Sequence, residues 1–116
     1  MLKAINSHSN NRLWYSDAYF DLIIWRDKNK EVEAFQLCYD IEHFERSLSW
    51  SKAYGFSHAQ IDGGEANPLK NQSPLFVADG IFEYDTIINR FKKASQSIDE
   101  EIRTFILQKM SQYALR

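Results

Sequence analysis

The spacing of apolar residues changes once along this chain, and this change constrains the fold more than any other feature. Between about residues 18 and 62, apolar and polar side chains alternate with a period near two, which is typical of β-strands. After Asp79 and Gly80, apolar residues recur every three or four positions, as in amphipathic helices. Strands followed by helices, without alternation, predict an α+β domain rather than a doubly wound parallel sheet.

Two hairpins are expected in the strand-rich part. Residues 18–26 and 31–39 flank the polar turn 27–30, and a turn centred between Lys28 and Asn29 places five residues on one inward face. These are Phe20, Leu22, Ile24, Phe35 and Leu37. Residues 46–52 and 56–62 form the second predicted hairpin, joined around residues 53–55. Its inward residues are predicted to be Leu48, Trp50, Ala59 and Ile61. A further strand at 73–78 completes an antiparallel β-meander of about five strands.

Two amphipathic helices follow, and we expect both to pack on one face of the sheet. The first carries Tyr84, Ile87, Ile88 and Phe91 on one side, with Asp85 as its predicted N-cap. The second is predicted to begin at a capping box formed by Ser97 and Glu100. Its apolar stripe consists of Ile98, Ile102, Phe105, Ile106, Met110 and Tyr113.

Length and composition narrow the class of protein. At 116 residues the chain fits a single domain, residues 1–116, and 44% hydrophobic residues are enough for a core. Cys38 is the single cysteine, so an intramolecular disulfide is excluded, and without a visible export signal we expect a cytoplasmic protein. The longest apolar run, Leu22–Trp25, predicts no membrane span, and a net charge of −2 makes nucleic acid an unlikely partner.

Motifs for nucleotide, zinc-protease, Ca²⁺ and serine-hydrolase sites do not occur, so we expect no cofactor. The best remaining constellation for catalysis or metal binding is His58, Asp62 and Glu65, at the end of a predicted strand and the start of a Gly-rich loop. Asp40 is a further candidate ligand from a neighbouring strand end. The alternative is that the acidic residues form turns and that His58 faces solvent beside Ser49.

Cys38 permits two interpretations. With His43 nearby in sequence it is a candidate nucleophile, because an imidazole can activate a thiol. A lone cysteine between Leu37 and Tyr39 is, however, typical of a small buried residue. The second interpretation is favoured, since closeness in sequence does not establish contact.

The first hairpin leaves a second apolar face. Its predicted members are Ile23, Trp25, Val32, Ala34 and Cys38, and Phe56 is predicted to be an exposed aromatic on the second hairpin. Two helices cover one side of such a sheet, so the other side is expected to bind a partner or a ligand. A homodimer is the simplest solution, with Trp25, Ile23, Val32 and Phe56 as binding residues. The alternative is that residues 1–17 fold back over this face.

Two functions remain from these observations. The first is a non-catalytic binding or protein-interaction domain, homodimeric, with a possible small-molecule or protein ligand. The second is a small hydrolase-like or divalent-metal-dependent enzyme that uses the loop around His58, Asp62 and Glu65.

Overall fold

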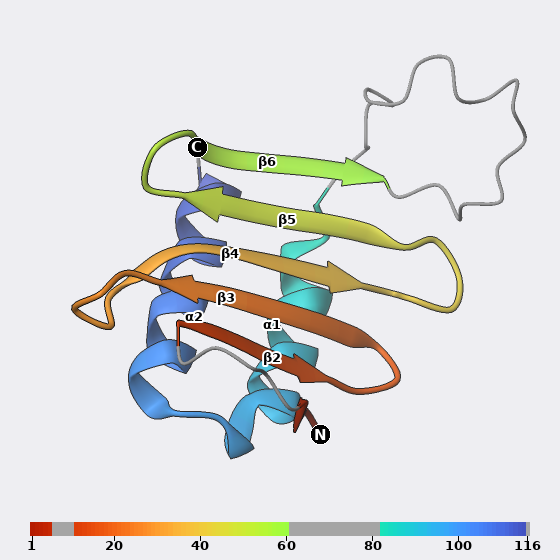
Figure 1. Ribbon diagram of the computed structural model, residues 1–116. Coiled ribbons are helices and arrows are strands. Elements are labelled where there is room, and N and C mark those ends of the chain that lie inside the picture. The colour runs from red at the N-terminus through yellow and green to blue at the C-terminus, as the bar shows by residue number, and fades with distance from the viewer. Residues whose placement is uncertain (6–10, 61–81, 116) are drawn as a thin grey trace, which may run out of the picture.

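The computed structural model describes residues 1–5, 11–60 and 82–115, which form an antiparallel sheet followed by helices (Figure 1). Six strands lie in the order of the sequence, each paired with the next. They are β1 (Lys3–Ile5), β2 (Arg12–Ser16), β3 (Phe20–Arg26), β4 (Val32–Tyr39), β5 (Arg46–Ser51) and β6 (Gly55–Gln60). Helix α1 (Tyr84–Ala94), the 3₁₀ turn η2 (Ser95–Ser97) and helix α2 (Glu100–Leu115) follow.

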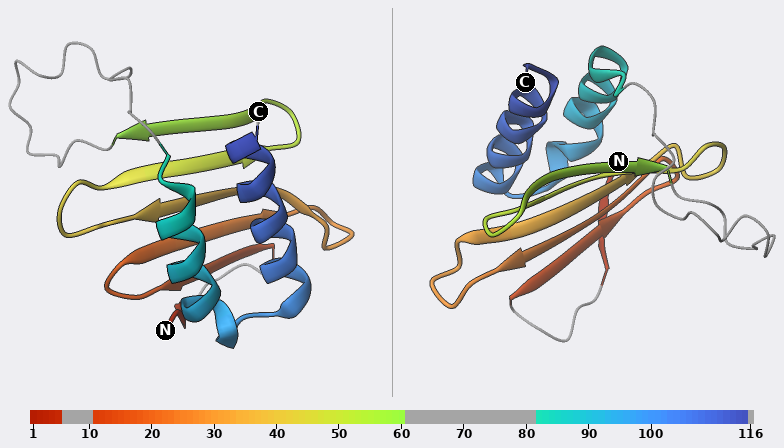
Figure 2. Two further views of the ribbon diagram at one scale, coloured as in Figure 1. Left: turned by 180° about the vertical axis from the view of Figure 1, so that it is seen from behind. Right: turned by 90° about the horizontal axis from the view of Figure 1, so that it is seen from above.

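The predicted α+β class and the antiparallel meander are therefore confirmed, with six described strands rather than about five. The predicted strand at 73–78 lies outside the described residues. Both helices lie across the strands on the same face of the sheet, as Figure 2 shows from behind and from above. This arrangement leaves a helix-covered face and an opposite face, which we call the open face. Within the described residues, no helix is both long and apolar enough to cross a membrane.

The first hairpin has the predicted inward face, but its register differs by two residues from that of a turn centred between Lys28 and Asn29. Phe20, Leu22 and Ile24 lie opposite Tyr39, Leu37 and Phe35, respectively. All six side chains are at most 1% exposed and face the helices. The alternation in the sequence was sufficient to predict this inward face, because a shift of one residue would move all the buried side chains of a strand to the opposite face.

Val32 departs from the prediction because β4 contains a bulge. Trp25 pairs with Ala34, but Arg26 pairs with Val32, so an extra residue in β4 reverses the facing of the strand at this point. Val32 consequently packs against the core on the helix-covered face and does not belong to the open face.

The predicted register of the second hairpin is wrong. Leu48 pairs with His58 and Trp50 pairs with Phe56, so Ala59 lies on the open face, while Ile61 lies outside the described residues. The reason is the turn: Gly55, with φ of +78°, already pairs with Ser51, so the loop is 52–54 rather than 53–55, and the pairing of β6 with β5 differs by an odd number of residues from the predicted facing. His58 and Phe56 therefore face the helices instead of solvent.

The N-terminal segment supplies two strands that were not predicted. β1 pairs with β2 and β2 pairs with β3, so the described parts of residues 1–17 widen the sheet instead of folding back over the open face. Leu2, just before β1, is 1% exposed. Its N–H donates to the carbonyl oxygen of Ala94 at 2.9 Å, and its own carbonyl accepts from the Ser97 hydroxyl at 2.7 Å.

Ser97 therefore ties the chain's start to η2 and is not the N-cap of α2, which begins at Glu100. The predicted capping box is wrong for this reason. Helix α1 likewise has Glu83, not Asp85, at its N-cap position, and Asp85 lies in the first turn, where its charge favours the helix dipole.

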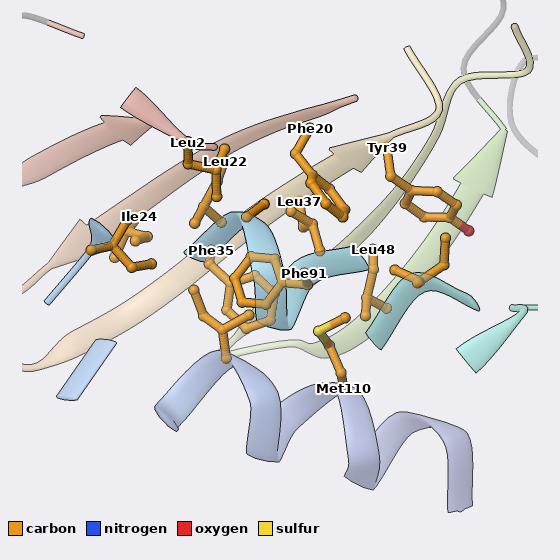
Figure 3. Packing of buried hydrophobic residues seen from close by; sticks show 14 of the residues in the cluster. Leu2, Phe20, Leu22, Ile24, Phe35, Leu37, Tyr39, Leu48, Phe91 and Met110 are labelled. Atoms are coloured by element: carbon orange, nitrogen blue, oxygen red, sulfur yellow. The ribbon is translucent and has the colours of Figure 1, made fainter. Parts of the chain in front are cut away.

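The core lies between the helix-covered face and the two helices (Figure 3). The rings of Phe20 and Phe91 meet edge to face with centroids 5.6 Å apart, and Met110 of α2 is fully buried. The predicted stripe of α2 is confirmed, since Ile98, Ile102, Ile106 and Met110 are buried and Phe105 and Tyr113 pack against the cluster.

Candidate functional site

His58 lies in an aromatic cluster on the helix-covered face. Its Nε2 is 2.6 Å from the hydroxyl oxygen of Tyr39, which comes from β4. Phe82 meets the imidazole edge to face at 5.4 Å between centroids, and Tyr113 of α2 lies at 5.8 Å. The imidazole is half-buried, and the prediction that it faces outward beside Ser49 is wrong. Sequence reasoning did not identify Tyr39 as its partner, because the two strands are not adjacent.

Of the other members of the predicted acid–base or metal site, only Asp40 lies within the described residues. Asp62 and Glu65 lie outside them. Asp40 is in a left-handed turn with φ of 56°, where its carbonyl accepts from the His43 N–H and its carboxylate lies 3.2 Å from His43 Nδ1. Asp40 thus has the geometry of the alternative reading, a turn residue. Across residues 1–5, 11–60 and 82–115, no three His, Cys, Asp or Glu side chains are placed to hold a metal ion.

A cationic region borders the aromatic cluster. The guanidinium of Arg90 lies 4.2 Å from the centroid of the Tyr19 ring, and that of Arg46 lies 5.8 Å from the centroid of Tyr39. Burial raises the pKa of Tyr19 above its usual value, as does the nearby charge of Asp40, while both arginines lower it. Tyr19 is consequently a neutral hydrogen-bonding group at physiological pH rather than a phenolate.

Cys38 is a buried thiol. Burial raises its pKa to about 11, and the charges of Glu45 and Asp21 act in the same direction. The amide of Gln36 donates to Sγ at 3.6 Å, whereas the His43 ring contacts Asp40. The nucleophile hypothesis lacks both the thiolate and the contact with an imidazole that it requires.

The open face is apolar on one half and rich in hydroxyl groups on the other. The apolar side chains of this face come from β1–β3 and are Ile5, Trp14, Ile23 and Trp25, which we call the apolar half; Lys3, Arg12, Ser16 and Asp21 lie on the same face of these strands. The hydroxyl half comes from β5 and β6 and consists of Ser47, Ser49, Ser51 and Ser57. Trp25 is 36% exposed and Ile5 38%. Of the four predicted binding residues, the structure therefore brings Ile23 and Trp25 to this face, and places Val32 and Phe56 on the other.

Polar groups on the open face are partly satisfied within it. The indole N–H of Trp14 donates to a carboxylate oxygen of Asp21 on the neighbouring strand. This bond gives the charged carboxylate of Asp21 a donor on the same face of the sheet. A shallow hollow of about 270 Å³ extends from Trp25 over Gln36 and Ser49 to Tyr54, which is 91% exposed.

A further cavity lies on the helix-covered side of the sheet, between α2 and the end of the β3–β4 hairpin. We call it the charged cleft; its volume is about 800 Å³. Val32, Trp50, Ile102 and Phe105 provide its apolar surface, and charged residues from the sheet and from α2 form its two walls. No sequence pattern identified this cleft, since its residues come from four separate segments.

No family model, curated protein or solved structure matches this chain. A functional proposal therefore rests on the contacts, burial and charges of the described residues.

Proposed function

We propose that this protein is a non-catalytic interaction domain that forms a homodimer through the open face of its sheet. The observation that carries this proposal is the pairing of two features: both helices lie on one face, and Ile23 and Trp25 lie at the centre of the apolar half of the other. An apolar strip on one side of an antiparallel sheet is stabilised when a second layer removes it from water.

A second copy of the chain fits this strip better than a charged partner does. A two-fold axis running close to β3 would set Ile23 and Trp25 of the two copies against each other, as an isologous interface requires. Ser49, Ser51 and Ser57 would lie toward the rim, where small hydroxyl groups hydrogen-bond to water without a large desolvation cost.

The size of the face sets the expected affinity. Six strands about 4.8 Å apart, with about six residues each at about 3.3 Å per residue, give a projected area of roughly 500 Å². Stable interfaces bury about 800 Å² per partner. The protruding side chains add area to this flat projection, but the buried area per partner still falls short of about 800 Å². We therefore expect a dimer with a dissociation constant in the micromolar range or above.

Sedimentation velocity over a wide range of protein concentration tests the proposal. The wild-type chain should shift from monomer to dimer, and Trp25→Asp should weaken the dimer by about tenfold or more, because a charge would have to be desolvated at the interface. Phe44→Asp is the matched control, since Phe44 is also an exposed aromatic, 65% accessible, but lies in the β4–β5 loop. A monomer at every concentration, or equal effects of both variants, would contradict the proposal.

The enzyme hypothesis has less support from the described residues. It needs His58 as a ligand or base, and the imidazole lies among aromatic rings with Nε2 directed at Tyr39. A divalent-ion thermal-shift screen on the wild type and His58→Ala addresses this hypothesis directly. Stabilisation by an ion that His58→Ala abolishes would favour the enzyme or metal-binding alternative over an interaction domain.

A further inference from the structure

We infer that the charged cleft binds a short zwitterionic peptide of two or three residues with an apolar side chain. This site is separate from the open face and does not depend on the proposed dimer. Three properties of the cleft carry the inference: an apolar floor, walls of opposite charge, and a volume that accommodates a short peptide.

The floor of the cleft is aromatic and preformed. The rings of Trp50 and Phe105 meet at 5.3 Å between centroids with an interplanar angle of 68°, and Phe35 stacks behind Trp50 at 6.3 Å. Ile102, at 6% exposure, is held by the core. Side chains fixed in this way present apolar surface to a ligand without an entropic cost of ordering.

The walls have opposite charges. Arg26, Lys30 and Lys52 lie on the sheet side, where Glu31 offsets one of the three positive charges. Asp99, Glu100 and Glu101 lie on the α2 side. A ligand with one positive and one negative end satisfies both walls at once, with its carboxylate near the basic wall and its ammonium group near the acidic wall.

Acidic residues in the first turn of a helix also stabilise the helix dipole, and by themselves they indicate no ligand. The distinguishing feature here is their placement across an apolar floor from a basic wall. The pKa of Tyr15 is raised first by burial and then by the charge of Asp99, and is lowered by Arg26, so one charge from each wall acts on this ring. Groups from both walls therefore act on the same region.

The volume of the cleft limits the length of the ligand. A volume of about 800 Å³ corresponds to a cube of roughly 9 Å on each edge. Each residue of an extended chain spans about 3.5 Å, so the ends of a peptide of two or three residues lie about 7–10 Å apart.

Titration of the ¹⁵N-labelled protein with the tripeptide Ala-Phe-Ala tests this inference by NMR. We expect saturable shifts of the Trp50 indole N–H and of backbone amides at 99–108, with smaller shifts at Trp25 on the open face. N-acetylated and C-amidated forms of the peptide should each bind about tenfold more weakly, because each lacks one of the charges that the walls recognise.

Charge reversal on each wall makes the test specific. Lys52→Glu should weaken the free peptide about tenfold but leave the amidated form unchanged, and Glu101→Lys should weaken the free peptide but leave the acetylated form unchanged. Lys93→Glu and Glu42→Lys are matched controls, since both residues are exposed and lie outside the cleft. All four substitutions replace exposed side chains, so the fold is expected to be retained, with circular dichroism as the check.

Two results would overturn the inference. The first is the absence of a saturable shift at Trp50 and residues 99–108 at millimolar peptide. The second is equal binding of a peptide capped at both ends, because recognition would then not involve the charged walls.

Discussion

The hydroxyl oxygen of Tyr39 lies 2.6 Å from Nε2 of His58, although β4 and β6 are separated by β5. The contact passes diagonally across β5, where Tyr39 pairs with Arg46 and His58 pairs with Leu48. It is a polar link inside an aromatic cluster, and it connects the centre of the sheet to its last described strand. Its removal therefore has a measurable consequence.

We expect Tyr39→Phe to lower the free energy of unfolding by about 1–2 kcal/mol. The substitution keeps the ring, which is 1% exposed, but leaves Nε2 of a half-buried imidazole without this partner. Urea denaturation provides the measurement. Tyr54→Phe is the control and should change stability by less than about 0.5 kcal/mol, because Tyr54 is 91% exposed. Equal midpoints for the two variants would show that the Tyr39 contact is energetically neutral.

Cys38 should react with a thiol reagent such as Ellman's reagent far more slowly in the folded protein than in urea. Its side chain is 8% exposed, and its pKa of about 11 leaves almost no thiolate at pH 8. Rapid labelling of the native protein would contradict this burial.

The same pKa predicts how stability depends on pH. The folded thiol holds its proton up to about pH 11, whereas the unfolded thiol releases it near its ordinary value of 9.0. The contribution of Cys38 is therefore fully present below pH 9 and is lost as the pH rises through 11. Tyr15 and Tyr19 also have raised pKa values, so the comparison of wild type with Cys38→Ala isolates the thiol. Cys38→Ala should lose less stability than the wild type between about pH 9 and pH 11, the window between the unfolded and folded pKa values of the thiol.

Substitutions of Asp40 test whether this residue acts as a turn residue or as a metal ligand. Its φ of 56° is accessible to Asp and Asn but costs a β-branched residue about 1–2 kcal/mol. Asp40→Val should therefore lower the free energy of unfolding by about that amount, while Asp40→Asn should stay within about 0.5 kcal/mol of the wild type. Thermal unfolding in the presence of EDTA provides the measurement. Strong destabilisation by Asp40→Asn would indicate instead that the negative charge itself is required.

The sequence predicted the structure best in elements where one periodic pattern of apolar residues runs along the whole element and marks its buried face. The alternation through Phe20, Leu22 and Ile24 and the helical stripe through Ile102, Ile106 and Met110 both predicted which side chains are buried. In these elements a shift of one residue would expose several large apolar groups at once, so pattern and structure agree.

Side chains whose facing was predicted incorrectly lie next to a bulge or a turn, where the local geometry sets the facing of the strand. One extra residue in β4 moved Val32 to the core, and the early start of β6 at Gly55 turned Phe56 and His58 inward. Neither event changes the composition of the strand, so periodicity does not reveal it. The charged cleft was missed for a different reason, because Arg26, Trp50 and Glu101 come together through tertiary packing.

Leu2 offers the clearest test of how the sheet is completed at its first strand. Chain ends are often poorly ordered, yet Leu2 is 1% exposed and is held by backbone contact with Ala94 and by the Ser97 hydroxyl. We expect Leu2→Ala to lower the free energy of unfolding by about 2–4 kcal/mol, since it leaves a cavity between β1 and the helix pair. Ile5→Ala, at a residue that is 38% exposed, should cost less than about 1 kcal/mol. Similar urea midpoints for the two variants would mean that the first strand contributes little to the core.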